Sequence, residues 1–174
     1  MLAAPSSSYG PLMHLAARNR DRPARPAEES TEDGPALRDA AIAAARAADD
    51  EEAAAAARDR FRIGPIPAIE ADDVIRPHLA AEERVHALRP HAILTGPGGD
   101  GALGYGGTLY LTSRRLVHLG QVVLSVSLAD LEESSLAGER LLLTLGDGEG
   151  LALDVDQPRL LRAEMAAVGR ELRR

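Results

Sequence analysis

Residues 106–119, GGTLYLTSRRLVHL, are the stretch from which the rest of the chain is interpreted. Leu109 and Leu111 alternate with Thr108, Tyr110 and Thr112, which is the period-two pattern of a β-strand with one buried face. Residues 113–115 interrupt this pattern, and residues 116–119 resume it. The stretch therefore predicts two antiparallel strands joined by a tight turn.

Similar alternation continues downstream. It predicts strands within residues 122–128, 131–136, 141–145 and 151–155, with a turn at residues 146–148. An earlier strand is expected over residues 84–94, where Pro90 implies an edge position or a bulge. Residues 158–173 carry apolar side chains at helical spacing, namely Leu161, Met165, Val168 and Leu172. We expect a mainly β protein with α, a small antiparallel β-barrel or sandwich capped by a C-terminal α-helix.

The same segments resemble a known family. GTLYLTSRRLVHL, SVSLADLEESSL, RLLLTL, GLALDV and the closing helix are similar to a bacterial pleckstrin-homology-like (PH-like) domain of the GRAM type. That family also has an LYLT-x-x-R-L strand pair and a following L-x-D-I/L segment, here Leu128, Asp130 and Leu131. The resemblance covers residues 79–173 and none of the N-terminal third. It implies a binding module for proteins or membrane lipids.

Composition divides the chain into four regions, the first three of which form an N-terminal extension. Residues 1–34 mix Ala, Ser, Pro, Arg and Glu with almost nothing to bury, which predicts a disordered tail. Residues 35–62 predict an Ala-rich acidic helix. Residues 63–78 are expected to be a connector with a short helical turn near residues 72–81, and residues 79–174 to be the PH/GRAM-like domain.

Few large apolar side chains are available to hold this extension on the domain. Leu37 and Ile42 are the large apolar residues of the helix, so we expect a helix that need not touch the domain. Its acidic run, residues 49–52, is interpreted as a solvated face, with a partner-docking patch as the alternative. The apolar groups able to pin the connector are Phe61, Ile63, Ile66 and Ile69.

Composition excludes several chemistries. The absence of Cys excludes disulfides, thiolate nucleophiles and Cys-ligated metals, and the absence of Lys excludes Schiff-base chemistry and the P-loop lysine. The net charge of −7 opposes nucleic-acid binding, and we interpret the basic N-terminal residues (Arg18, Arg20, Arg22 and Arg25) as part of a solvated tail. No export signal or membrane-spanning run is visible, so a cytoplasmic location is expected.

Three residue groups were weighed as sites. A formal G-x-G-x-x-G occurs at Gly99, Gly101 and Gly104, but a strand follows it where a dinucleotide site needs a helix, so a flexible hairpin loop is expected. His86, His91 and His118 are candidates for a metal site only if the first and third strands are neighbours, and we expect satisfied or exposed histidines. The acidic residues Asp147, Glu149, Asp154 and Asp156 lack calcium-loop spacing. We therefore expect no catalytic, cofactor or metal residues, and no enzyme.

Two functions remain in view after these exclusions. The first is a protein-interaction module, and the alternative is a peripheral lipid-binding module; an enzyme is third. The lipid alternative rests on Arg170, Arg173 and Arg174 at the end of the closing helix, with Arg159 and Arg162 at its start. Residues 95–107, the loop matching the phosphate-binding loop of related domains, carry Asp100 and no Arg, which predicts no specific inositol-phosphate binding.

Overall fold

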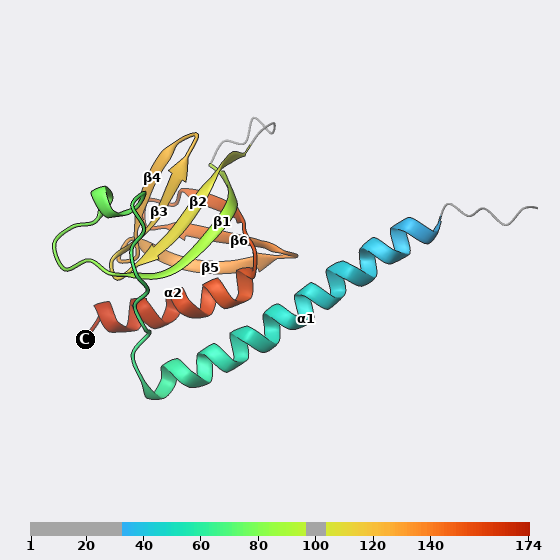
Figure 1. Cartoon of the computed structure of the whole chain (residues 1–174), viewed down its shortest axis with the longest axis horizontal. Coiled ribbons are helices and arrows are strands. Elements are labelled where there is room, and N and C mark those ends of the chain that lie inside the picture. Colours follow the sequence, from blue (N-terminus) through green and yellow to red (C-terminus); the bar gives the residue numbers. More distant parts are fainter. Residues whose placement is uncertain (1–32, 97–103) are drawn as a thin grey trace, which may run out of the picture.

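The computed structural model describes residues 33–96 and 104–174. Seven antiparallel strands form one sheet in the order β4-β3-β2-β1-β7-β6-β5, and α2 closes it (Figure 1). The strands are β1 (Val85–Thr95), β2 (Tyr105–Thr112), β3 (Arg115–Gly120), β4 (Val123–Ser127), β5 (Leu131–Ala137), β6 (Arg140–Leu145) and β7 (Gly150–Asp154). The helices are α1 (Asp33–Ile63), the short η1 (Arg76–His78) and α2 (Pro158–Leu172). The predicted fold class is therefore confirmed.

The main core lies between the curled sheet and α2. Its fully buried side chains include Leu111 of β2, Leu143 of β6, Leu153 of β7 and Leu161 of α2. The predicted apolar stripe of α2 is buried at Leu161, Met165 and Val168, but Leu172 is 43% exposed because it lies in the last turn of the helix. The apolar side chains that alternate along the strands and those at helical spacing in α2 thus pack in one core.

β1 carries the bulge that Pro90 predicts. The strand is central in the sheet, so the edge alternative is wrong. Its pairing with β2 shifts register between Arg89 and Ala92, and His91 adopts a positive φ of 57°. Beyond the bulge, Ile93 to Thr95 also pair with β7. Pro90 is tolerated because the bulge interrupts the ladder where proline has no N–H to donate.

Both faces of β2 are buried, whereas the sequence predicted one. Leu109 and Leu111 face the main core, and Tyr110 is 3% exposed in a second cluster with Ile75, Val85 and others. That second cluster is covered by residues 64–84, which we call the strap. Ile66 of the strap also enters the main core. Of the predicted anchors, Ile63 is exposed and Ile69 is 44% exposed, while Ile75, which sequence reasoning missed, is fully buried.

Carboxylates fix the strap in addition to these apolar contacts. The two oxygens of Glu83 accept hydrogen bonds from the Arg115 guanidinium, at 2.9 Å each, and one also accepts from the Thr112 hydroxyl at 2.6 Å. Asp72 accepts from the Tyr110 hydroxyl at 2.9 Å. Burial alone would raise the pKa of Glu83, but these hydrogen bonds, one from the Ala80 N–H and the Arg115 charge together lower it to about 2.

Helix α1 packs along α2, contrary to the expectation that it need not touch the domain (Figure 1). Ala54 and Ala57 of α1 are buried against Ala163 of α2, with Phe61 packed at the margin. Small side chains allow the two helices to approach closely, so a helix whose contact face has a single large apolar residue, Phe61, still docks. The helix includes residues 33 and 34 of the predicted tail, and residues 1–32 lie outside the described part. No helix of the described residues is long and apolar enough to cross a membrane.

Candidate functional site

The three candidate histidines do not gather. Strand β2 lies between β1, which carries His86 and His91, and β3, which carries His118. The Nδ1 of His86 is 2.9 Å from the Pro67 carbonyl oxygen, and that of His118 is 3.2 Å from the Val122 oxygen. His91 is exposed at the bulge. Both buried rings are only half satisfied, because each Nε2 lacks a hydrogen-bond partner in the described residues.

The other candidate groups are also dispersed. Asp154 forms a bidentate pair with Arg140, at 2.7 Å for both bonds, and Asp147 accepts a hydrogen bond from the backbone N–H of Glu149 within its own turn. Among the residues that the structure describes, no three His, Cys, Asp or Glu side chains are placed to hold a metal ion. Gly99 and Gly101 of the G-x-G-x-x-G lie outside the described residues.

One carboxylate with a strongly shifted pKa, Glu83, is closed to substrates. Its side chain is fully buried, and its oxygens accept four hydrogen bonds, three from the side chains of Arg115 and Thr112 and one from the Ala80 N–H. Shifted carboxylates often mark catalytic sites, but a general base needs access to the proton that it removes. Glu83 therefore acts as an anchor for the strap.

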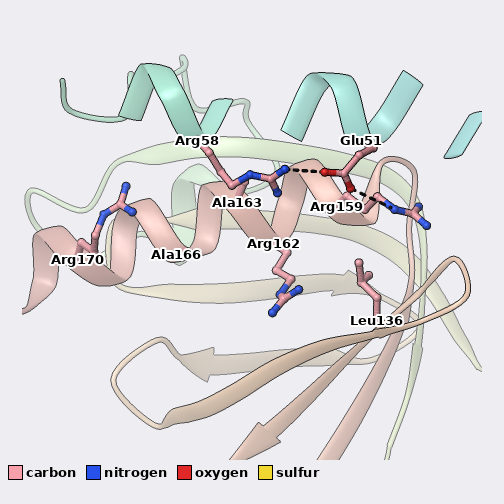
Figure 2. Close-up of a pocket in the computed structure, with 8 residues that line it drawn as sticks. All are labelled: Glu51, Arg58, Leu136, Arg159, Arg162, Ala163, Ala166 and Arg170. Atoms are coloured by element: carbon pink, nitrogen blue, oxygen red, sulfur yellow. Dashed lines mark hydrogen bonds and ion pairs between the residues drawn. The ribbon is translucent and has the colours of Figure 1, made fainter. Parts of the chain in front are cut away.

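A trough runs along the exposed face of α2, between α1 and β5 (Figure 2). Its floor is Arg162, Ala166 and Arg170, which stand one helical turn apart and are exposed. One wall is α1, with Glu51 and Arg58, and the other is β5, with Ser134 and Leu136. The open cavity between these walls has a volume of about 310 Å³.

The trough continues along the edge of β5. A second cavity of about 140 Å³ lies between β5 and α2 and is lined by Leu131, Ser134, Met165 and Gly169, among others. β5 ends the strand order and pairs only with β6, so no described strand occupies its outer edge. The unpaired backbone of this edge therefore lies beside a helix face made of small residues and arginines.

The arginines of the trough differ in how they are paired. Arg58 contacts Glu51 at 2.6 Å, and Arg159 at the end of the trough contacts Glu139 at 3.0 Å. Arg162 donates to the Ser134 hydroxyl at 3.4 Å, and Arg170 donates to the Phe61 carbonyl at 3.2 Å. Neither Arg162 nor Arg170 forms an ion pair with any acid in the described part of the chain. Two cationic side chains thus remain available on the trough floor.

The position of the α1 wall depends on Asp50. Its carboxylate accepts hydrogen bonds from the backbone N–H groups of Arg159 and Leu160, at 2.8 and 2.9 Å, and caps the start of α2. Gln157, the residue at the cap position, makes no such bond. Asp50 is 2% exposed, so the interpretation of residues 49–52 as a solvated face is wrong at this position. Asp50 instead contacts α2 of its own chain.

Comparisons with known proteins found two similar solved structures and no family. No protein-family model matches the sequence. No curated protein matches it either. Among solved structures, "Vps36 N-terminal PH domain" is similar with a TM-score of 0.49 and 20% identity over 62% of this chain and 96% of that chain. The C-terminal domain of an unknown protein from Leishmania infantum has a TM-score of 0.46 and 10% identity over 56% of this chain and 92% of that chain. Both scores are below 0.5, so we transfer no function from either structure.

Proposed function

We propose that this protein is a non-catalytic, PH-like binding module whose trough takes an extended segment of a protein partner. The observation that carries the proposal is the unpaired edge of β5 beside the exposed face of α2. An extended segment added to such an edge gains main-chain hydrogen bonds, while pockets beside it select side chains. Assignment to the GRAM type is part of the same proposal.

The outer edge of β5 is suited to strand addition over part of its length. A bulge between Leu131 and Glu133 disturbs the first residues, and Glu132 and Glu133 add charge there. From Ser134 to Ala137 the pairing with β6 is regular. Bulges and charges are common devices that protect an edge against pairing, and the regular part lacks both. We therefore place the bound backbone against residues 134–137.

Membrane binding is the alternative that the sequence raised, and charge argues against it. The cavity between β4 and the β6–β7 turn is lined by four acids, Asp130, Glu132, Asp147 and Glu149. These groups repel anionic headgroups from that side of the sheet. Arg170, one of the three arginines on which the alternative rests, lies on the floor of the concave trough, where it donates to the Phe61 carbonyl. A concave trough also fits a chain segment better than a flat bilayer.

The proposal is tested by selecting random displayed peptides on the full chain. We expect a set of related peptides whose binding is lost in Ala166→Trp, because Ala166 is exposed on the trough floor and a large side chain fills the space. Ala129→Trp is the matched control, since Ala129 is exposed in the acidic cavity on another side. Both variants are checked for an unchanged melting temperature.

Three results would overturn the proposal. The first is that no peptide is enriched over a column without protein. The second is that the selected peptides bind Ala166→Trp normally. The third is strong sedimentation with vesicles of anionic lipid at physiological salt that disappears when Arg170, Arg173 and Arg174 are replaced, which would establish the lipid alternative.

A further inference from the structure

We infer that the segment bound in the trough is acidic, and that Arg162 and Arg170 receive carboxylate side chains on either side of Ala166. This inference rests on the proposed function and names the class of its ligand. It goes beyond strand addition, which depends on backbone groups and does not require a particular charge. It also assigns a binding role to α1, which lies outside the part of the chain that resembles PH-like domains.

The floor of the trough is built so that its charges flank a gap. Residues 162, 166 and 170 lie on one face of α2, and the middle residue is alanine. Figure 2 shows Arg162 directed toward β5 and Arg170 directed toward α1, in agreement with their bonds to Ser134 and Phe61. The alanine leaves room for a ligand between the two guanidinium groups.

Charge in the first cavity of the trough is not balanced by its own acids, whereas the second cavity, along β5, is lined by Glu132, Glu133 and Arg173. The first cavity is lined by four arginines, Arg58, Arg159, Arg162 and Arg170, and by Glu51 alone among the acids. Arg58 is neutralised by Glu51, and Arg159 by Glu51, Asp50 and Glu139. Arg162 and Arg170 remain, and guanidinium groups form strong bidentate bonds with carboxylates. The complementary ligand therefore carries negative charge.

The spacing of the two arginines favours a peptide over a single small anion. The two residues are eight positions apart along the helix, which is a rise of about 12 Å. The two side chains point apart, so they do not converge on one ion. An extended peptide rises about 3.3 Å per residue and repeats the same face every second residue. Two acidic residues about four positions apart would match the two arginines.

The wall formed by α1 strengthens this selection. It places Arg58 and Glu51 opposite β5 and narrows the space above α2. Charge interactions are stronger where protein walls exclude water than on an open surface. Asp50 sets the position of this wall by bonding the first backbone N–H groups of α2. The extension thus adds a wall to the exposed face of α2 and makes it one side of an open cationic trough.

The test compares the peptides selected on the native chain and on the charge-reversed variant Arg162→Glu/Arg170→Glu. On the native chain we expect enrichment of Asp and Glu, with two acids about four positions apart. On the variant we expect this preference to change to Lys and Arg. A selected peptide with both acids replaced by Gln or Asn should bind the native chain at least about tenfold more weakly. Arg114→Glu, an exposed arginine at the β2–β3 turn, is the matched control and should keep the acidic preference.

Failure of this inference is distinguishable from failure of the proposed function. Selected peptides without an acidic preference, or an acidic preference unchanged in the charge-reversed variant, would overturn the inference and leave the binding module standing. An absence of any selected peptide would overturn both. If inorganic phosphate at millimolar concentration displaces the bound peptide as effectively as added free peptide does, the site binds a small anion and the peptide assignment is wrong.

Discussion

The two halves of α1 are both rich in alanine but have different environments. The outer half, residues 34–49, contains the large apolar residues Leu37 and Ile42, and these are 68% and 45% exposed. The docked half, residues 50–63, contacts α2 mainly through Ala54 and Ala57, which are 0% and 3% exposed. The docked half also has Phe61 at the margin of the contact, so the number of large apolar residues alone does not decide which half docks. A buried carboxylate and a surface of small side chains decide it instead.

A buried carboxylate, Glu83, also fixes the strap that follows α1. Its replacement is expected to have the largest effect. Glu83→Ala removes the acceptor of four hydrogen bonds and leaves Arg115 beside a void. We expect a loss of about 3 kcal/mol in the free energy of unfolding, measured by urea denaturation. A loss below about 1 kcal/mol would show that apolar contacts of Ile66 and Ile75 alone hold the strap.

The same carboxylate predicts how stability depends on pH. The pKa of Glu83 is about 2 in the folded protein, against 4.5 for an unperturbed Glu. Its contribution is therefore present above about pH 4.5 and is lost as the pH falls toward 2, because the unfolded chain binds the proton first. Melting temperatures of the native chain and of Glu83→Gln should converge over this acidic range. A constant difference between them from pH 6 to pH 2 would contradict this sign.

Replacing Asp50 tests whether its cap on α2, rather than the acidic composition around it, holds the docked half of α1. Asp50→Ala leaves two N–H groups of α2 without acceptors, which should lower stability by about 2 kcal/mol. Asp49→Ala, at an exposed neighbour, should change it by less than about 0.5 kcal/mol. Equal effects of the two substitutions would show that the charge of the acidic run matters more than the cap.

The small-residue contact can be tested by adding volume to it. Ala57→Leu places a larger side chain where α1 meets α2 and should cost about 1–2 kcal/mol. Ala56→Leu, one position away on the exposed face, should leave the denaturation midpoint unchanged. If Ala57→Leu instead raised stability, the interface would contain free volume and the close approach of the helices would not be limiting.

The smallest effect is expected in the outer half. Leu37→Ala with Ile42→Ala removes the two large apolar side chains, but both are exposed. We expect a change of less than about 0.5 kcal/mol, since alanine also favours the helix. A larger loss in the free energy of unfolding that occurs only at high protein concentration, where sedimentation detects self-association, would show that these side chains become buried against a second copy.

The strands and α2 were predictable because their patterns are local. Leu109 and Leu111 alternate within β2, and Leu161, Met165 and Val168 follow the helical period. Ile75 was missed because its segment is short and rich in Asp, Pro and His, and no period distinguishes it from its exposed neighbour Val74. Asp50 was misinterpreted because its partners are 109 and 110 positions away, and no local signal distinguishes it from its acidic neighbours.

The sequence indicated arginines of the candidate site but not the walls that make it a trough. The sequence indicated a basic cluster of Arg170, Arg173 and Arg174 at the end of the closing helix, with Arg159 and Arg162 at its start, as a possible membrane contact. Of these five residues, Arg159, Arg162 and Arg170 line the first cavity of the trough. The sequence did not indicate the walls, because the edge position of β5 follows from the complete strand order and the α1 wall follows from the Asp50 cap. Arrangement between distant segments, rather than composition, turns the cluster into a site.

The docking of α1 on α2 has a consequence for synthesis in the cell. α1 leaves the ribosome early, whereas Arg159 and Leu160, which Asp50 caps, are made more than 100 residues later. At typical translation rates the interval is roughly 5–20 s. During that time Ala54 and Ala57 have no α2 to cover them, and the strap has no β2 and β3 to cross. α1 is therefore made before the domain but is among the last segments to reach its final contacts.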